Sequence, residues 1–162
     1  MHFKTLFPNQ LKLKKYFKKK NTTIFEKSIY NFILKFSNVK EHTKKYKIYN
    51  PTKIKTEEMA SNPISTTFLK FISSIVKPKN ILEIGSFVGI SAMELSESLA
   101  KNGKITTLEK YDVFYKVAKI NFKQNKLDRK INIIHGDALK ILNSGTLKKN
   151  FDIIFIDGFK EK

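Results

Sequence analysis

The chain has 162 residues and no cysteine, which excludes a disulfide framework, a thiolate metal site and a cysteine nucleophile. Its three histidines are scattered and give no support to a metal site built from imidazoles. No run approaches the roughly 20 apolar residues of a membrane span, and lysines interrupt the first residues before a signal-peptide core could form. We therefore expect one domain, no membrane association and a reducing, cytoplasmic setting.

Arginine is nearly absent, since 31 of the 32 basic residues are lysine and Arg129 is the exception. The net charge of +18 is uneven, because residues 1–55 hold 15 lysines against two glutamates, a charge of +13. A cationic face attracts the phosphates of RNA, but arginine is the residue that pairs bidentately with phosphates and guanines. An AT-rich coding sequence would produce the same lysine bias. We favour a solvated surface for this segment and leave RNA binding open.

The first third of the sequence predicts little regular structure. In residues 1–55, a basic amino-terminal segment, we expect one amphipathic helix over about residues 24–37, where apolar residues recur at helical spacing. A polar, lysine-rich connector follows. Asn62 and Pro63 then form a favourable helix start, and the pattern predicts a helix that ends before Lys77.

From Asn80 onward the sequence alternates between short apolar runs and amphipathic stretches. The expected strands cover residues 81–84, 104–108, 131–134 and 151–156, and the expected helices cover residues 91–100, 113–125 and 138–142. This alternation predicts an α/β fold in which helices cover both faces of a parallel sheet. Ligands bind such sheets at the carboxyl ends of the strands. The loops that begin at Glu83, Glu109, Gly136 and Asp157 are therefore the candidate site.

The first of these loops lies in the sequence ILEIGSFVGIS, from Ile81 to Ser91. Its glycines, Gly85 and Gly89, have the spacing G-x-x-x-G, which disfavours the dinucleotide turn of a nicotinamide enzyme. A carboxylate at Glu83 would repel a pyrophosphate and suits a ligand that carries positive charge. S-adenosylmethionine has an ammonium and a sulfonium, and its carboxylate can use backbone N–H donors and Ser91. The alternative is that Glu83 is a strand-end acid satisfied by nearby amides.

Acids also stand at the ends of the later predicted strands. From the position of Glu109 a carboxylate accepts hydrogen bonds from ribose hydroxyls, and Asp137, in the sequence HGDA, is placed to meet an adenine edge. Asp157 offers an oxygen ligand to Mg²⁺. Lys160 could take a proton from a substrate hydroxyl if its pKa were lowered. Each residue alone could be a solvated loop residue, but their places at successive strand ends indicate one site.

Together these segments resemble the cation-dependent O-methyltransferases of the catechol and caffeoyl-CoA type, a class I S-adenosylmethionine-dependent family. The resemblance runs from about Ile29 to Lys160. The sequence MASNPISTTFLKFI is similar to the family's cofactor-covering segment and the helix after it, and ILEIGSFVGISAMELSESL to its motif I. The later segments KITTLEKYDVFYKVAKINFKQNKL, INIIHGDALKIL and FDIIFIDGFK are similar to its second, third and fourth strand regions. The resemblance implies a Rossmann-like doubly wound sheet, with residues 56–162 as a cofactor-binding domain that holds the first four strands.

The resemblance also implies the residues of the site. The implied contacts to S-adenosylmethionine are Met59, Ser61, Glu83, Gly85, Phe87, Gly89, Ser91, Glu109, Lys110, Asp137 and Ala138. Asp157 would bind Mg²⁺ and Lys160 would be the catalytic base. The implied reaction is direct in-line transfer of the methyl group to a substrate oxygen, with the metal holding the acceptor's oxygens.

The end of the chain departs from the family pattern. The family continues with three more strands, and an Asp-Asn pair after the fifth strand supplies further metal ligands, whereas this sequence stops at Lys162. A single carboxylate would hold Mg²⁺ weakly. The apolar run over residues 151–156 would also be left as an exposed sheet edge. We therefore expect a C-terminally truncated chain with most of the cofactor half and, for a full-length form, a homodimer.

Two functions stay open from the sequence. The first is an S-adenosylmethionine-dependent O-methyltransferase whose acceptor is a small-molecule hydroxyl or a hydroxylated uridine in tRNA, as in bacterial relatives of this type. The lysine-rich first third weakly favours RNA. The second is a basic RNA-binding or partner-binding module in which a decayed methyltransferase half serves only as a scaffold.

Overall fold

The computed structural model describes residues 45–61, 63–147 and 150–158 of the chain. The helix expected over residues 24–37 and the expected base, Lys160, lie outside these residues. By its internal contacts the chain divides between Asn38 and Val39, so residues 45–55 group with the residues that follow them. The expected division at residue 55 between a basic segment and a cofactor-binding domain stays a prediction.

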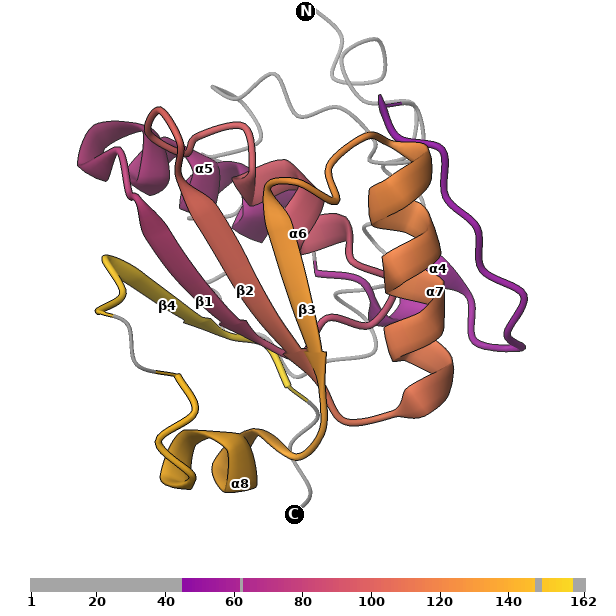
Figure 1. Ribbon diagram of the computed structural model, residues 1–162. Coiled ribbons are helices and arrows are strands. Elements are labelled where there is room, and N and C mark those ends of the chain that lie inside the picture. Colours follow the sequence, from indigo (N-terminus) through magenta and orange to yellow (C-terminus); the bar gives the residue numbers. More distant parts are fainter. Residues whose placement is uncertain (1–44, 62, 148–149, 159–162) are drawn as a thin grey trace, which may run out of the picture. The chain divides into compact units, whose positions relative to one another are not determined.

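A four-stranded parallel sheet forms the centre of the described structure (Figure 1). Its strands, in the order in which they lie side by side, are β3 (Ile131–His135), β2 (Lys104–Glu109), β1 (Asn80–Ile84) and β4 (Ile153–Ile156). The strand order reverses at β1, because β2 and β3 extend to one side of it and β4 pairs with its other side. Such a reversal places a crevice at the carboxyl ends of the strands. The predicted Rossmann-like α/β fold is thus confirmed for these four strands.

Five helices are described around the sheet. They are α4 (Thr56–Met59), α5 (Pro63–Val76), α6 (Ile90–Leu95), α7 (Asp112–Gln124) and α8 (Ala138–Asn143). The helix predicted over residues 91–100 is shorter than expected and ends at Leu95. Two serine hydroxyls explain the early end, since Ser96 donates to the carbonyl of Met93 at 2.7 Å and Ser98 donates to that of Leu95 at 2.9 Å. Such side-chain bonds compete with continued helix.

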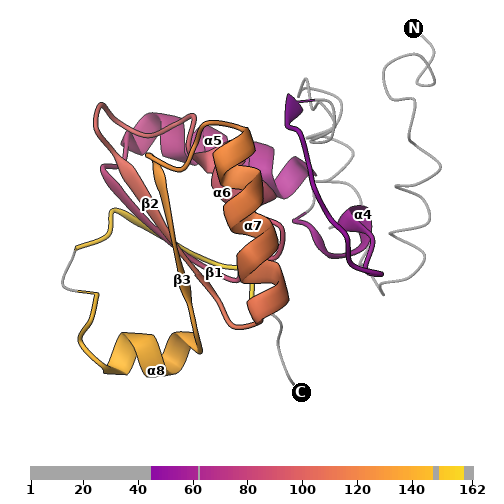
Figure 2. The same ribbon diagram turned by 45° about the vertical axis from the view of Figure 1, so that its right-hand side comes forward.

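One face of the sheet carries the hydrophobic core. Figure 2 shows α5, α6 and α7 on one side of the sheet and α8 on the other. Side chains that alternate along the strands, among them Ile81, Ile105 and Ile131, point into the covered side and pack with Met93 and Phe122. This packing fixes the strands from which the loops of the candidate site emerge.

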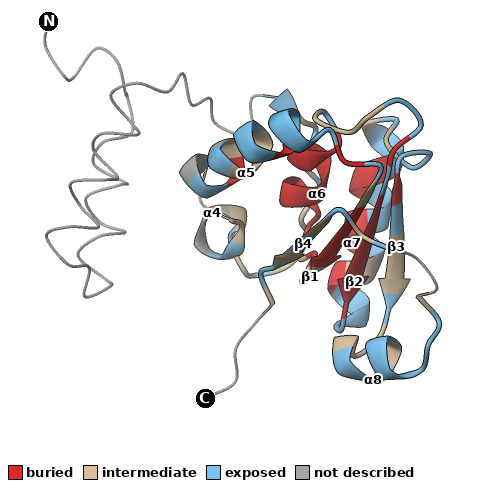
Figure 3. Ribbon diagram, turned by 90° about the vertical axis from the view of Figure 1, so that its left-hand side faces the viewer, coloured by how far each residue is buried: buried red, intermediate tan, exposed pale blue. Residues whose placement is uncertain are grey.

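The sequence predicted helices on both faces of the sheet. Within the described residues, the opposite face is less completely covered than this prediction implies. Along β4, Ile153 and Phe155 pack against the core, whereas Ile154 and Ile156 are 59% and 64% exposed (Figure 3). Within the described residues β4 pairs only with β1, so it is the outer strand of the sheet. This agrees with the expectation of an exposed apolar edge.

The helix α5 turns much of its apolar surface away from the core. Thr66 and Ser73 are buried on its inner side, while Phe68, Phe71 and Ile75 are exposed. Its inner side is attached by Leu69, which packs against the core, and by polar contacts. The ammonium of Lys70 lies 2.7 Å from a carboxylate oxygen of Glu94 in α6, and Ser73 shares a hydrogen bond with Ser98, just after α6. None of the helices in the described part of the chain is long and apolar enough to cross a membrane.

Candidate functional site

A cavity of about 640 Å³ lies where the strands end at their carboxyl termini. Residues after all four strands line it, together with residues from the segment that leads into α5. The predicted site residues found in its wall are Met59, Ser61, Gly85, Phe87, Ser91, Glu109, Lys110, Asp137, Ala138 and Asp157. The structure thus brings together side chains that are up to about a hundred positions apart in the sequence. Glu83 and Gly89 are not among the lining residues.

The two glycines of the loop after β1 allow two different close contacts. Gly85 and Gly89 both have positive φ angles, 95° and 88°, which glycine adopts without steric cost. A Cβ atom on Gly85 would lie 2.7 Å from the carbonyl oxygen of Asp157, so this glycine lets the loops after β1 and β4 approach each other. A Cβ atom on Gly89 would lie 2.3 Å from the ring of Phe122. Gly89 therefore serves packing behind the cavity, and its expected contact with the cofactor stays a prediction.

The carboxylate of Glu109 organises the same loop. One of its oxygens accepts hydrogen bonds from the backbone N–H groups of Ser86 at 3.1 Å and Phe87 at 2.8 Å. The other accepts from the N–H of Tyr111 at 2.9 Å. A carboxylate offers about four acceptor positions, so these three bonds leave one for a ligand. Glu109 thus fixes the loop after β1 to the end of β2 and keeps capacity for a ligand hydroxyl.

Glu83 is fully buried and lies behind the cavity wall. The hydroxyls of Ser91 and Thr107 each donate to its carboxylate at 2.5 Å. Burial, with smaller contributions from the charges of Asp157 and Glu109, raises the pKa of Glu83 to about 7 against the opposing effect of the two hydroxyls. Glu83 does not line the cavity, and its expected contact with the cofactor stays a prediction. Glu83 orients Ser91, and Ser91 lines the cavity.

Asp137 and Lys110 connect the loops after β3 and β2. Asp137 is the N-cap of α8 and accepts a hydrogen bond from the backbone N–H of Lys140 at 3.2 Å. The ammonium of Lys110 lies 3.8 Å from the other carboxylate oxygen of Asp137. The cap explains why this acid occupies a defined position at the edge of the cavity.

An aromatic wall completes this side of the cavity and was not predicted. Phe114 lies edge-on to Phe87, with ring centroids 4.8 Å apart, and to Tyr111, with centroids 6.1 Å apart. All three residues line the cavity. In the sequence, Tyr111 and Phe114 have the i, i+3 spacing of a helix start, which was the only available signal. Flat apolar side chains beside Glu109 suit a planar ring system.

Ser86 is a further residue of the cavity wall that the sequence did not predict. Its hydroxyl is buried in the cavity wall and is the one buried side-chain polar atom without a hydrogen-bond partner in the described part of the chain. Buried polar groups normally have partners, and an isolated exception calls for an explanation such as a ligand.

The described residues do not fit a magnesium site on their own. The hydroxyl of Ser61 donates a hydrogen bond to the carboxylate of Asp157. The carboxylate of Glu109 already accepts three hydrogen bonds from backbone N–H groups. No group of three or more metal-ligating side chains gathers within the residues the structure covers. Mg²⁺ prefers several oxygen ligands, and Asp157 supplies the carboxylate of only one residue.

Comparison with known proteins agrees with this site and fold. The model of a protein family described as O-methyltransferase matches residues 28–162. The chain is 30% identical to a caffeoyl-CoA O-methyltransferase of Stellaria longipes, over 63% of this chain and 44% of that protein. It is 34% identical to a catechol O-methyltransferase of Niastella koreensis, over 61% of this chain and 46% of that protein.

Solved structures show the same likeness. An O-methyltransferase from Bacillus cereus in complex with SAH has a TM-score of 0.58 and 31% identity, over 62% of this chain and 46% of that one. An SAH-bound methyltransferase from Podospora anserina has a TM-score of 0.68 and 25% identity, over 82% of this chain and 56% of that one. The chain spans about half the length of the curated relatives it matches. By the family match, the strand order and the arrangement of the strand-end loops, the chain belongs to the O-methyltransferase family.

Proposed function

We propose that the cavity binds S-adenosylmethionine for transfer of its methyl group to a hydroxyl oxygen. The observation that carries the proposal is the meeting around one cavity of Ser91 at the start of α6, Glu109 at the end of β2 and Asp137 after β3. The family match and the SAH in the structures of two relatives support the same ligand class.

The charges and the shape of the cavity suit this ligand. Carboxylates of Glu109, Asp137 and Asp157 lie on its wall and favour a positively charged ligand. A volume of about 640 Å³ is in the range of cofactor sites. When bound, S-adenosylmethionine supplies a methyl group activated by a positively charged sulfur.

Each part of the wall has a distinct task in the proposal. Glu109 keeps one acceptor position for a ribose hydroxyl, and the rings of Phe114 and Tyr111 cover the adenine. The carboxylate of Asp137, which follows β3 at the rim of the cavity, accepts a hydrogen bond from the adenine amine. The hydroxyl of Ser91 donates to Glu83, which leaves its lone pairs to accept a hydrogen bond from the ammonium at the methionine end. These contacts fix the reactive sulfur in one place, and alignment of this kind is a large part of catalysis in direct transfer.

The acceptor is proposed only as a class, a small-molecule hydroxyl or a hydroxylated tRNA base. The lysine-rich composition is the feature that favours RNA. Titration of tRNA binding with salt separates the two, because phosphate contacts predict an affinity that falls steeply as salt rises. An affinity for tRNA that does not change with salt would exclude a phosphate footprint.

Magnesium enters the proposal only through the family resemblance. Asp157 would be one ligand, and the other oxygen ligands would have to come from outside the described residues or from the acceptor. Cofactor binding does not depend on the metal in this proposal. Binding of S-adenosylmethionine should therefore be the same in EDTA as in magnesium buffer.

Isothermal titration of the 162-residue chain with S-adenosylmethionine tests the proposal. We expect saturable binding at one site and displacement by S-adenosylhomocysteine. Circular dichroism on the same sample shows whether the chain is folded. A folded sample without binding at millimolar ligand would refute the proposal.

A matched pair of variants locates the site. Asp137→Asn keeps the helix cap, because asparagine caps as well as aspartate, but removes the charge that strengthens a bond to the adenine amine. The loss of about 1 kcal/mol corresponds to about fivefold weaker binding. Asp128→Asn makes the same chemical change at an exposed position outside the cavity and should bind like wild type. Equal affinities of the two variants would contradict the role of Asp137.

A further inference from the structure

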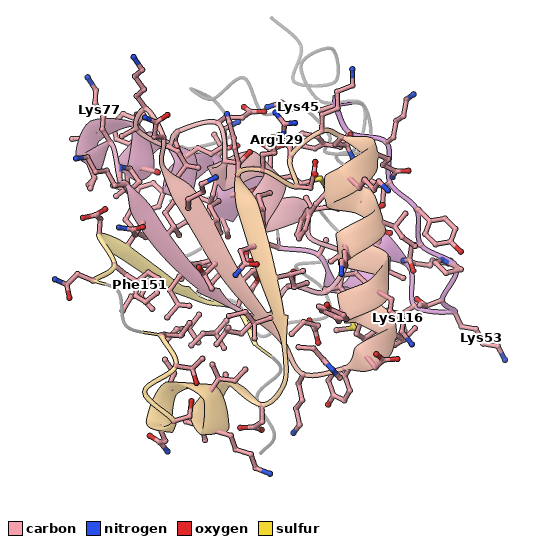
Figure 4. The ribbon with its side chains drawn as sticks, viewed as in Figure 1. Lys45, Lys53, Lys77, Lys116, Arg129 and Phe151 are labelled. Carbon is pink, nitrogen blue, oxygen red and sulfur yellow. The ribbon has the colours of Figure 1, made fainter. Side chains whose placement is uncertain are left out.

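Residues 45–55, here called the strap, run along α7 and lead into α4 (Figure 1). Lys45 and Lys53, labelled in Figure 4, mark positions near its two ends. The strap delivers Ile54 and, after it, Met59, Ala60 and Ser61 to the wall of the cavity. What holds the strap therefore determines where this part of the wall lies. We propose that Asn121 and Asn125 are positioning residues that fix the strap and, through it, the wall of the cofactor cavity.

Each asparagine pairs with the backbone of one strap residue in the way a neighbouring strand would. The amide oxygen of Asn121 accepts from the N–H of Tyr49 at 2.8 Å, and its amide nitrogen donates to the carbonyl of the same residue at 3.0 Å. Likewise, the amide oxygen of Asn125 accepts from the N–H of Lys47 at 3.0 Å, and its amide nitrogen donates to the carbonyl of Lys47 at 2.8 Å. The two side chains therefore satisfy all four backbone groups of two alternate strap residues.

The distance between the two asparagines along the helix matches the distance between their two partners along the extended strap. Residues four apart in a helix are about 6 Å apart along its axis. Residues two apart in an extended chain are about 6.6 Å apart. Asn121 and Asn125 are four apart, and their partners Tyr49 and Lys47 are two apart. A shift of the strap by one residue would break both pairs, so the pairs define its register.

Asn121 also connects the strap to the first loop of the cavity. Its side chain is fully buried, and its amide nitrogen donates to the carbonyl of Val88 at 2.9 Å as well as to that of Tyr49. Gln124 reinforces the arrangement by donating to the carbonyls of Lys47, at 2.5 Å, and of the Asn121 side chain, at 2.8 Å. Order in the loop around Val88 and order in the strap are thus linked through one side chain.

Contacts before and after the two pairs complete the attachment. Before them, the hydroxyl of Tyr46 donates to the carbonyl of Met93 at 3.2 Å and to Glu97 at 2.5 Å. After them, the side chain of Asn50 donates to the carbonyl of Ile54 at 2.9 Å and to the hydroxyl of Thr56 at 3.0 Å. The second set forms the turn that directs the chain into α4. A register fixed at Lys47 and Tyr49 is therefore carried to Ile54 and beyond.

Linkage gives the inference a measurable consequence. It rests on the proposed binding of S-adenosylmethionine, because the cavity whose wall is positioned is the cofactor cavity. A ligand that orders the loop at Val88 should also order the strap, since Asn121 holds both. The amide of Tyr49 should accordingly exchange its hydrogen more slowly when the ligand is bound.

The test uses the whole chain and two variants, one that removes bonds to the strap and one that serves as a matched control. Asn125→Ala removes the two bonds that Asn125 makes to Lys47 and leaves Asn121, and the bond from Gln124 to Lys47, in place. Lys123→Ala changes an exposed residue two positions earlier in α7, whose side chain makes no hydrogen bond or ion pair with the described residues. Amide exchange at Lys47 and Tyr49 is followed by NMR without ligand, and the affinity for S-adenosylmethionine is measured by titration. The sheet amides serve as an internal measure of global stability.

The expected result is specific to the strap. In Asn125→Ala the amide of Lys47 should exchange about tenfold faster, and S-adenosylmethionine should bind about three- to tenfold more weakly. The exchange of the sheet amides should not change by a similar factor, and Lys123→Ala should resemble wild type in every measurement. Unchanged exchange at Lys47, or faster exchange with unchanged affinity, would overturn the inference. If wild type itself does not bind, the proposed function fails, while the exchange rates without ligand still decide whether Asn125 holds the strap.

Discussion

Replacing Gly89 by alanine should destabilise the chain through a direct clash. The new Cβ atom would lie 2.3 Å and 2.6 Å from two ring carbons of Phe122, and 3.4 Å from the Cβ atom of Ala118. The residue would also keep a φ angle of 88°, which costs a non-glycine residue about 1–2 kcal/mol. Overpacking of a close-packed core adds about 1–3 kcal/mol. We therefore expect the free energy of unfolding to fall by about 2–5 kcal/mol for Gly89→Ala.

Gly145→Ala is the matched control for this change. Gly145 also has a positive φ angle, 67°, but no atom lies within 4 Å of the position that a Cβ would take. Only the backbone cost of about 1–2 kcal/mol should therefore appear. Urea unfolding of both variants, followed by circular dichroism, measures the difference, which isolates the clash with Phe122. Equal losses in the two variants would refute the assignment of Gly89 to packing between the loop and α7.

Two further predictions concern buried charge. The pKa of Glu83, about 7 in the folded chain, lies above the ordinary value of 4.5, so the folded state binds the extra proton and stability should fall as pH rises from 4.5 through 7, by about 3 kcal/mol in total. Urea unfolding between pH 5 and pH 8 should show this fall in wild type and not in Glu83→Gln, and an equal fall in both would show that another group is responsible. Removal of the Lys70 ammonium in Lys70→Ala leaves the buried carboxylate of Glu94 with a contact to Lys45 at 3.5 Å, and should lower the free energy of unfolding by about 1–3 kcal/mol. Lys77→Ala, at an exposed position just after α5, should have no such effect, and a loss as large as that of Lys70→Ala would contradict the assigned role of the ion pair.

The sequence predicted the sheet well because its signal is local. Apolar runs of four to six residues, separated by amphipathic stretches, allow few folds other than a parallel sheet with crossover helices. The places of Glu109 and Asp137 followed from the same pattern, because strand ends in a parallel sheet meet at one edge. The burial of Glu83 behind the cavity wall has a reason that is visible in the sequence. Glu83 has the same parity as Ile81, so its side chain points to the helix-covered face.

Other features depend on contacts that no local pattern shows. The strap is a polar, lysine-rich connector in the sequence, and its order comes from Asn121 and Asn125, more than 70 positions away. The aromatic wall forms only when α7 begins beside the loop that carries Phe87. The outward apolar side of α5 was also not predicted, since hydrophobic periodicity indicates an amphipathic helix but not which side is buried.

The most direct test of the account is to map S-adenosylmethionine onto the folded chain by NMR. The bonds from Glu109 to the amides of Ser86, Phe87 and Tyr111 predict that these three amide signals shift on addition of the ligand. The amide signals of residues at the amino-terminal ends of the strands, such as Gly103 just before β2, should not shift. Shifts confined to the amino-terminal ends of the strands, or no shifts at saturating ligand, would contradict the placement of the cofactor at their carboxyl ends.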